Sequence, residues 1–281
     1  MTTLLEPFQF EFFRNGTLAA VLVGALCGLI GVYIVLRGMS YIGHGLSHAI
    51  FGGAVVSFVM SWNFYVGAGL WGFVAAVLIN QTVRRTKIGA DAAIGVITTA
   101  SFAVGVALIS RYRRFTRSFD AALFGNILGV TQQDVWVVVG VTLLVMLVIF
   151  FFYKQLLFTT FDADVAQVYG VRTAWVDTLF ALVLAAALIV SMQILGVTLI
   201  AAALVVPAIT ARLMTDSFSR MMLYSTLIGA STGLLGMYLS YYVDVASGAT
   251  IVLLQAGLFS VVLAITSLQK RAGRRLLHTH V

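Results

Sequence analysis

The stretch RGMSYIGHGLSHAIFGGAVVS, residues 37–57, holds two of the four histidines of this chain in an otherwise apolar region. His44 and His48 are four residues apart, so on a helix both imidazoles lie on one face with Cβ atoms about 5–6 Å apart. A polar pair is costly in a bilayer unless it faces a bundle interior or a water-filled cavity. Small residues around the pair permit another backbone to approach closely; they are Gly43, Gly45, Ser47, Ala49, Gly52, Gly53 and Ala54.

The composition of the whole chain is that of a polytopic membrane protein. It has 281 residues, of which 61% are hydrophobic and 10% charged, and its mean hydropathy is +1.04. A soluble domain is about 45–50% apolar and about 25% charged. The net charge of +7 fits the excess of Lys and Arg in cytoplasmic loops better than a nucleic-acid-binding surface. The single cysteine, Cys27, excludes an intrachain disulfide and a cysteine-cluster metal site.

The apolar segments predict an all-α fold with eight to nine transmembrane helices in one membrane domain over residues 1–281. The short N-terminal segment 1–16 and the basic C-terminal tail 269–281 lie outside these spans. The second span is rich in glycine and the seventh contains Pro207, so either one can be short, bent or broken. A helix needs about 20 apolar residues to cross a bilayer, and the segments that satisfy this are 17–36, 42–61, 64–83, 92–110, 134–153, 173–192, 195–214, 220–240 and 248–268.

The basic residues indicate how the chain is oriented. Cytoplasmic loops are enriched in Lys and Arg, and most of the 17 basic residues fall on the inside if the N-terminus is outside. This predicts an external N-terminus and a cytoplasmic C-terminus. The cluster from Arg111 to Arg117 argues against this orientation, because it would then lie outside.

Two polar segments are expected on the cytoplasmic side. In residues 154–172, Asp162 and Asp164 are placed to open a short helix and Gly170 to end it. In the seventh span, Pro207 is expected to kink or break the helix. The chain is then expected to leave the membrane and fold back as a short cytoplasmic element, although composition alone favours an ordinary connecting loop. That element carries Thr210, Arg212, Asp216, Ser217, Ser219 and Arg220.

Several catalytic motifs are missing from the sequence. No phosphate-binding loop GxxxxGK[ST] is present, so the chain is not expected to hydrolyse nucleotide itself. HGLSH lacks the glutamate of the metalloprotease motif HExxH, and no GxSxG motif indicates a hydrolase. Nearly all carboxylates fall at span ends, which argues against the buried acidic relay of a proton-coupled pump. The chain is therefore not expected to be an enzyme.

The spacing of His44 and His48 leaves two interpretations open. Both side chains can line a helix interface and form hydrogen bonds across it. Alternatively, two histidines at this spacing are a common pair of metal ligands. Two imidazoles make an open and weak site, which suits an ion that must leave again. We expect the pair to contact a translocated metal ion.

Four stretches together resemble a known family of membrane permeases. They are LRGMSYIGHGLSHAIFGG (36–53), LFGNILGVTQQDVW (123–136), FDADVAQVYGV (161–171) and LGVTLIAAALVVPAITARLMT (195–215). Their order and spacing are similar to those of the transmembrane permeases of zinc/manganese ABC importers, which are distant relatives of the cobalamin and siderophore permeases. The resemblance covers most of the chain and implies a type II ABC importer-like fold in the bacterial plasma (inner) membrane.

This resemblance implies partners and a mechanism. Two copies of the chain would form a homodimer in the lipid bilayer, with the metal pathway along the dimer axis. Two copies of a separate ATPase subunit would use ATP on the cytoplasmic side, and an extracytoplasmic metal-binding protein would deliver the ion. The chain would hold no permanent cofactor, only zinc or manganese in transit, and its spans would alternate access between the two sides. No nucleic acid partner is expected.

The resemblance also assigns a role to the polar segments. The segment after Pro207 would dock into the ATPase as the coupling element, through Pro207, Thr210, Arg212, Asp216, Ser217 and Arg220. The loop over residues 161–170 would lie nearby. It meets the family pattern F-D-x-x-x-A-x-x-x-G with Phe161, Asp162, Ala166 and Gly170.

One departure from the family bears on the choice of metal. Where the family usually has aspartate in G-D-x-x-S-H, this chain has His44, whereas Ser47 and His48 match. Imidazole suits zinc, copper, iron and nickel, and carboxylate suits manganese. The change shifts the expectation from manganese toward zinc.

Two other functions compete with a metal importer. A secondary metal-ion transporter driven by an ion gradient predicts inverted repeats and buried acidic residues, and neither is found in the sequence. A structural or receptor subunit without transport predicts that His44→Ala has no metal-dependent effect.

Overall fold

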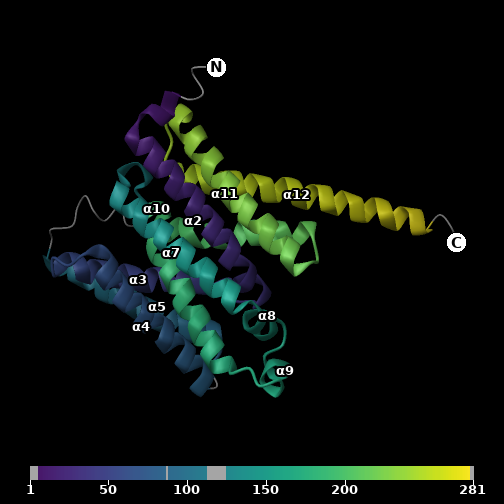
Figure 1. Cartoon of the computed structure of the whole chain (residues 1–281), viewed down its shortest axis with the longest axis horizontal. Helices are drawn as coiled ribbons and strands as arrows, with labels where there is room; N and C mark the ends of the chain where they lie inside the picture. The colour runs from purple at the N-terminus through teal and green to yellow at the C-terminus, as the bar shows by residue number, and fades with distance from the viewer. Residues whose placement is uncertain (1–5, 87, 113–124, 279–281) are drawn as a thin grey trace.

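The computed structural model describes residues 6–86, 88–112 and 125–278, with side chains described up to residue 269. The described part is helical and contains no strand, which confirms the predicted all-α polytopic fold (Figure 1). The long helices are α2 (Glu11–Leu36), α3 (Ile42–Val59), α4 (Phe64–Arg85), α5 (Ala90–Tyr112), α7 (Gln132–Phe151), α10 (Thr173–Met214), α11 (Phe218–Val243) and α12 (Ser247–His278). The short ones are η1 (Glu6–Gln9), η2 (Ile127–Gly129), α8 (Tyr153–Phe161) and α9 (Ala163–Val168).

Eight helices of the described chain are long and apolar enough to cross a membrane. One of them, α10, covers two of the nine expected spans, 173–192 and 195–214. Its 42 residues would measure about 63 Å as a straight helix, which is twice the hydrocarbon thickness of a bilayer. The length of α10 therefore requires that it bend.

α10 folds back at Gly196, whose backbone angles are φ 79° and ψ 163°. The Tyr33 ring, near the end of α2, packs against Phe180 in the first limb of α10 at a centroid distance of 6.0 Å. The same ring packs against Phe218, just after the second limb, at 5.5 Å. The chain thus leaves the Tyr33 end of the bundle and returns to it, so the two limbs correspond to two spans.

The expected break at Pro207 is wrong, because the helix continues through this residue to Met214. Glycine tolerates the positive φ of the actual break, a conformation that other residues rarely adopt. Proline removes one backbone donor, and the buried surroundings of Pro207 hold the helix together there. Residues 215–217 lead directly into α11, so the short cytoplasmic element expected after Pro207 does not form.

The core is centred on α2 and α10, the most deeply buried of the long helices. α2 packs against α11 at small residues, where the Ser225 hydroxyl donates a 2.6 Å hydrogen bond to the Gly28 carbonyl. A Cβ atom on Gly28 would overlap the Ser225 carbonyl, and one on Gly31 would overlap the Leu204 carbonyl of α10. Small residues therefore let α2 lie between two neighbouring helices at close range.

α3, α4 and α5 form a second group of helices that lie side by side (Figure 1). Gly52 of α3 faces the Ser101 carbonyl of α5, and Gly53 faces the Gly67 carbonyl of α4. A side chain at either glycine would overlap these groups. The small residues around the histidine pair thus bring neighbouring helices close, as the sequence predicts, and α3 itself is unbroken.

α12 extends away from the bundle, as Figure 1 shows. Its beginning is anchored, because Gln255 donates a 3.2 Å hydrogen bond to the hydroxyl of Thr232 in α11. Beyond this anchor, apolar side chains such as Val261 and Leu268 are exposed. An apolar surface of this kind is stable in lipid or against another helix.

Candidate functional site

His44 and His48 lie on one face of α3, as their spacing predicts. Their Nε2 atoms are 3.2 Å apart, and the ring centroids are 4.5 Å apart with the planes at 79°. One Nε2 atom donates and the other accepts, so one proton lies between these two nitrogens. The sequence left a helix-interface role and a metal-ligand role open, and this geometry allows both.

The surroundings of the pair leave it half-buried. The His48 ring packs edge-on against Phe102 of α5 at 4.9 Å, and the His44 ring lies 5.7 Å from Tyr41. Within the described structure, the buried Nδ1 atom of His48 has no hydrogen-bond partner. Ser47 is fully buried, and its hydroxyl lies 2.7 Å from the His44 carbonyl oxygen and 3.3 Å from that of Val197. Ser47 therefore joins the histidine segment to the second limb of α10.

The geometry of the pair suits a shared metal ion. Zn–N bonds of 2.0–2.1 Å in a tetrahedral site separate two ligand nitrogens by about 3.3 Å, close to the observed Nε2 separation of 3.2 Å. The described residues contain no group of three or more His, Cys, Asp and Glu side chains that could hold a metal. A metal ion at this pair would therefore find two His ligands among the described residues of one chain.

Gln193, in the first limb of α10, is bonded to the start of α7 and to Asn126. Its side-chain amide donates a 3.0 Å hydrogen bond to Asp134 at the start of α7, and the Tyr65 hydroxyl of α4 donates to the same carboxylate at 2.8 Å. The backbone carbonyl of Gln193 accepts a 3.2 Å hydrogen bond from the backbone N–H of Asn126. These bonds hold the chain just before the Gly196 fold, so their role is structural.

The predicted short helix in residues 154–172 is confirmed as α9. The Asp162 carboxylate caps it by accepting from the amides of Asp164 and Val165 at 3.1 and 2.9 Å. Gly170 ends it with a φ of 81°. Ala166 is fully buried and anchors the helix, whereas four apolar or aromatic side chains are exposed: Phe161, Val165, Val168 and Tyr169.

The residues after Pro207 divide into a buried and an exposed set. Pro207 and Thr210 are buried in α10, and the Thr210 hydroxyl donates to the Val206 carbonyl at 2.7 Å. The exposed set runs from the end of α10 through the following turn into the start of α11 and is Arg212, Asp216, Ser217 and Arg220. Only this second set is open to a partner.

The two predicted coupling segments meet at one end of the bundle. The Phe161 ring lies 6.0 Å from the ring of Phe218 at the start of α11. The hydroxyls of Tyr153 and Ser219 lie 3.4 Å apart. A partner that contacts α9 can therefore also reach the turn between α10 and α11.

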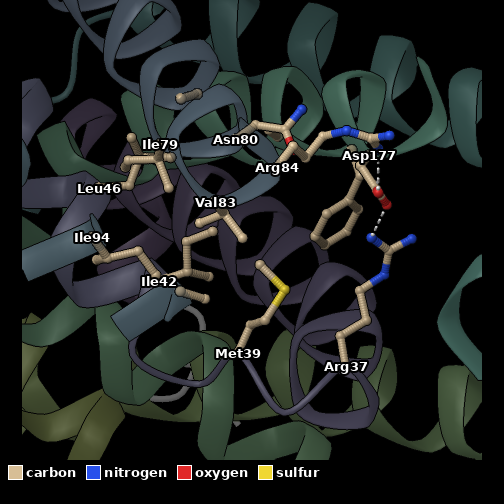
Figure 2. A pocket seen from close by; sticks show the side chains of 14 residues that line it. Arg37, Met39, Ile42, Leu46, Ile79, Asn80, Val83, Arg84, Ile94 and Asp177 are labelled. Carbon is tan, nitrogen blue, oxygen red and sulfur yellow. Dashed lines mark hydrogen bonds and ion pairs between the residues drawn. The ribbon is translucent and has the colours of Figure 1, made fainter. Parts of the chain in front are cut away.

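An arginine cluster that the sequence did not reveal lies at the same end. Arg37, directly after α2, donates to the hydroxyls of Thr160 and Thr159 in α8 at 3.1 and 3.0 Å and to Asp177 in α10 at 3.0 Å. Asp177 also accepts from Arg84 of α4 at 3.3 Å, so Figure 2 shows its carboxylate between two guanidinium groups. A single sequence could not show this pairing, because Arg37 and Asp177 are 140 residues apart.

The Arg37 guanidinium is buried, with 8% of its side chain exposed. Burial lowers the pKa of this group, and the attraction of the Asp177 carboxylate opposes that shift. The guanidinium carbon also lies 4.4 Å from the centroid of the Phe180 ring. Beside it is a cavity of about 180 Å³ whose lining includes Met39 and Ile42 (Figure 2).

Some sequence predictions fall outside the described residues. Within the basic cluster, Arg111 is the last-turn residue of α5, and Arg113, Arg114 and Arg117 are not described. The first two residues of the stretch 123–136 are also outside, although η2 and the start of α7 are in place.

Comparison with known proteins shows what this chain is similar to. The model of the ABC 3 transport family matches residues 9–266. The manganese import system permease protein ScaB of Streptococcus gordonii is 38% identical over 268 residues, covering 95% of this chain and 96% of ScaB. The manganese transport system membrane protein MntC of Halalkalibacterium halodurans is 36% identical over 255 residues, covering 91% of this chain and 87% of MntC.

A solved structure has the same architecture. In PsaBC from Streptococcus pneumoniae in complex with Fab, one chain superimposes with a TM-score of 0.84 and 35% sequence identity. The match covers 93% of this chain and 94% of that chain. The likeness therefore extends over nearly the whole fold.

Proposed function

This chain belongs to the ABC 3 transport family, and we propose that it is the permease subunit of an ATP-driven importer for a divalent transition metal ion. It is an integral protein of the bacterial plasma membrane and a transport subunit rather than an enzyme. The observation that carries the proposal is the separation of 3.2 Å between the Nε2 atoms of His44 and His48 within the helix bundle. Polar side chains at such positions typically serve an ion pathway.

The histidine pair contacts the metal in transit. The ion takes the place of the hydrogen bond between the two Nε2 atoms, and the donor ring carries its proton on Nδ1 instead, so that both Nε2 lone pairs face the ion. Two nitrogen ligands hold the ion weakly enough to release it. A homodimer brings a second pair to the axis, which gives four imidazoles around one ion. This arrangement is supported by the lack of a third ligand among the described residues of one chain.

The cargo is zinc or manganese. Imidazole nitrogen favours zinc over manganese. His44 occupies the position at which the permeases that this chain resembles usually have aspartate. Two of the similar proteins are named for manganese. Direct competition between the two ions is therefore the measurement that identifies the cargo.

Two copies of a separate ATPase subunit dock at the end of the bundle that carries α9. The exposed side chains Val168 and Tyr169 support this assignment, because apolar and aromatic groups at a polar loop are typical of protein interfaces. The exposed residues Asp216 and Ser217 of the turn and Arg220 at the start of α11 form the rim of the same surface. An extracytoplasmic metal-binding protein delivers the ion to the opposite end.

This assignment places the N-terminus outside and the C-terminus in the cytoplasm. α2 then ends on the cytoplasmic side at Arg37, in contact with α8. Arg84 lies at the same end through its bond to Asp177. The basic residues support this orientation, since they gather at cytoplasmic ends of spans.

The test is metal uptake into proteoliposomes that contain this subunit with its ATPase and binding protein. Wild type is compared with His44→Ala/His48→Ala while zinc and manganese compete. ATP-dependent uptake that the double variant loses, with the complex still assembled, is the expected result. Uptake that needs an ion gradient instead of ATP would indicate a secondary transporter. Unchanged uptake in the double variant would show that the two histidines serve helix packing and not metal binding.

A further inference from the structure

Arg37 stands at a junction between the docking end and the histidine helix. It is the first residue after α2, and only residues 38–41 separate it from α3. α8, which its guanidinium contacts, is followed by α9 after the single residue Asp162. One side chain thus lies between the segment proposed to bind the ATPase and the segment proposed to bind metal.

The contact with α8 uses the fork shape of the guanidinium. Thr160 donates its hydroxyl proton to the Leu156 carbonyl at 2.6 Å, and Thr159 donates to the Gln155 carbonyl at 2.9 Å. Both hydroxyl oxygens therefore have lone pairs free to accept from Arg37. A lysine at position 37 has the charge but not the rigid fork that reaches two hydroxyls and a carboxylate together.

The charge of Arg37 is balanced inside the protein. Asp177 accepts at 3.0 Å, and the Phe180 ring lies 4.4 Å from the guanidinium carbon. A buried charge is very costly to leave without a partner. The guanidinium is therefore expected to stay with these groups when the elements move, so that α2, α8 and the first limb of α10 shift together.

Residues 38–41, which connect Arg37 to α3, contain a candidate hinge at Gly38. Gly38 has a φ of 67°, and nothing lies within 4 Å of the position a Cβ would take. Met39 and Ile42 border the cavity of about 180 Å³ (Figure 2), which gives this connection room to shift. α3 can therefore change its angle to α2 when Arg37 is displaced.

We propose that Arg37 is a positioning residue that transmits movement of α8 and α9 to the start of α3 and so sets the position of His44 and His48. This inference rests on the proposed function. ATPase closure displaces α9, the two threonines of α8 carry Arg37 with them, and residues 38–41 pass the displacement to α3. Arg37 contacts neither the metal nor the ATPase in this scheme.

Two test variants distinguish the contact between Arg37 and α8 from the charge of Arg37. Arg37→Lys keeps the charge, and Thr159→Val/Thr160→Val removes both acceptors on α8 while the pair with Asp177 remains. Arg84→Met is the matched control, because Arg84 binds the other oxygen of Asp177 and no residue of α8. Each variant is reconstituted with the ATPase and binding protein, and uptake and ATP hydrolysis are measured in the same vesicles.

The expected result is uncoupling. The number of metal ions taken up per ATP falls about two- to thirtyfold in Arg37→Lys and in the double threonine variant, as typical coupling energies predict. ATP hydrolysis and complex assembly stay near wild type even where the lost hydrogen bonds lower the melting temperature, and Arg84→Met transports normally. An unchanged ratio in both test variants overturns the inference. A parallel loss of uptake, ATP hydrolysis and melting temperature in both test variants also overturns it, because that pattern is expected if Arg37 only stabilises the fold.

Failure of the proposed function has a different signature. Wild type then shows no ATP-dependent uptake even with competent partners, whatever the variants do. A second measurement follows α3 directly. In a Cys27→Ser background, Tyr41→Cys places a thiol at an exposed position, and its rate of labelling should change on ATP addition. The double threonine variant should abolish that change, and a retained change would contradict the linkage.

Discussion

Gly24 of α2 and Gly229 of α11 face each other so closely that a Cβ atom on either would overlap the carbonyl group of the other. Overpacking of this kind typically costs about 1–3 kcal/mol. Gly24→Ala and Gly229→Ala should each lower the free energy of unfolding by this amount, measured by thermal or denaturant unfolding in detergent. Gly257→Ala in α12 is the control, because nothing lies within 4 Å of its added Cβ. Equal stability of all three variants would contradict the close packing.

The fold of α10 gives a second prediction. Gly196→Ala places a side chain at φ 79° and ψ 163°, a region that is essentially restricted to glycine, at a cost of about 1–3 kcal/mol. Pro207→Ala in the continuous part of the same helix should keep or raise stability, because it restores a backbone donor. Melting temperatures of the two variants check this, and the reverse order would place the break at Pro207.

The third prediction concerns the choice of metal. His44→Asp exchanges a nitrogen ligand for a carboxylate, and should shift competition between zinc and manganese toward manganese. Ser40→Asp adds the same charge at an exposed residue before α3 and is the matched control. Uptake of each ion in the presence of the other is the measurement. An equal shift in both variants would indicate a general charge effect and not a ligand.

The fourth prediction distinguishes the two docking segments. Tyr169→Asp puts a charge on the exposed aromatic residue directly after α9 and should weaken ATPase binding by about 2 kcal/mol or more, as expected of a hot spot. Gln167→Glu adds a charge to the same helix without removing apolar surface. Arg220→Glu tests the start of α11, next to the turn after α10. Affinity for the purified ATPase is measured for each, and a loss confined to Arg220→Glu would make the turn the main coupling element.

Local features of the chain were readable from its residues alone. The spans follow from apolar runs, and the ends of α9 follow from Asp162 and Gly170, because a cap needs only neighbouring backbone groups. The shared face of His44 and His48 follows from helical periodicity. Each of these depends on residues within one or two turns of each other.

Other features were decided only by tertiary packing. The proline at 207 has the stronger local signal for a break, yet α10 folds at Gly196, where Gln193 is held by Asn126 and Asp134.

The sequence by itself thus determined the helices, their membrane character and the histidine pair, since hydrophobicity and capping act over a few residues. The tertiary structure decided that Arg37 joins α8 to α10. Its partners Thr159 and Asp177 lie 122 and 140 residues away, and a buried guanidinium takes whichever acceptors the packed helices bring within about 3 Å.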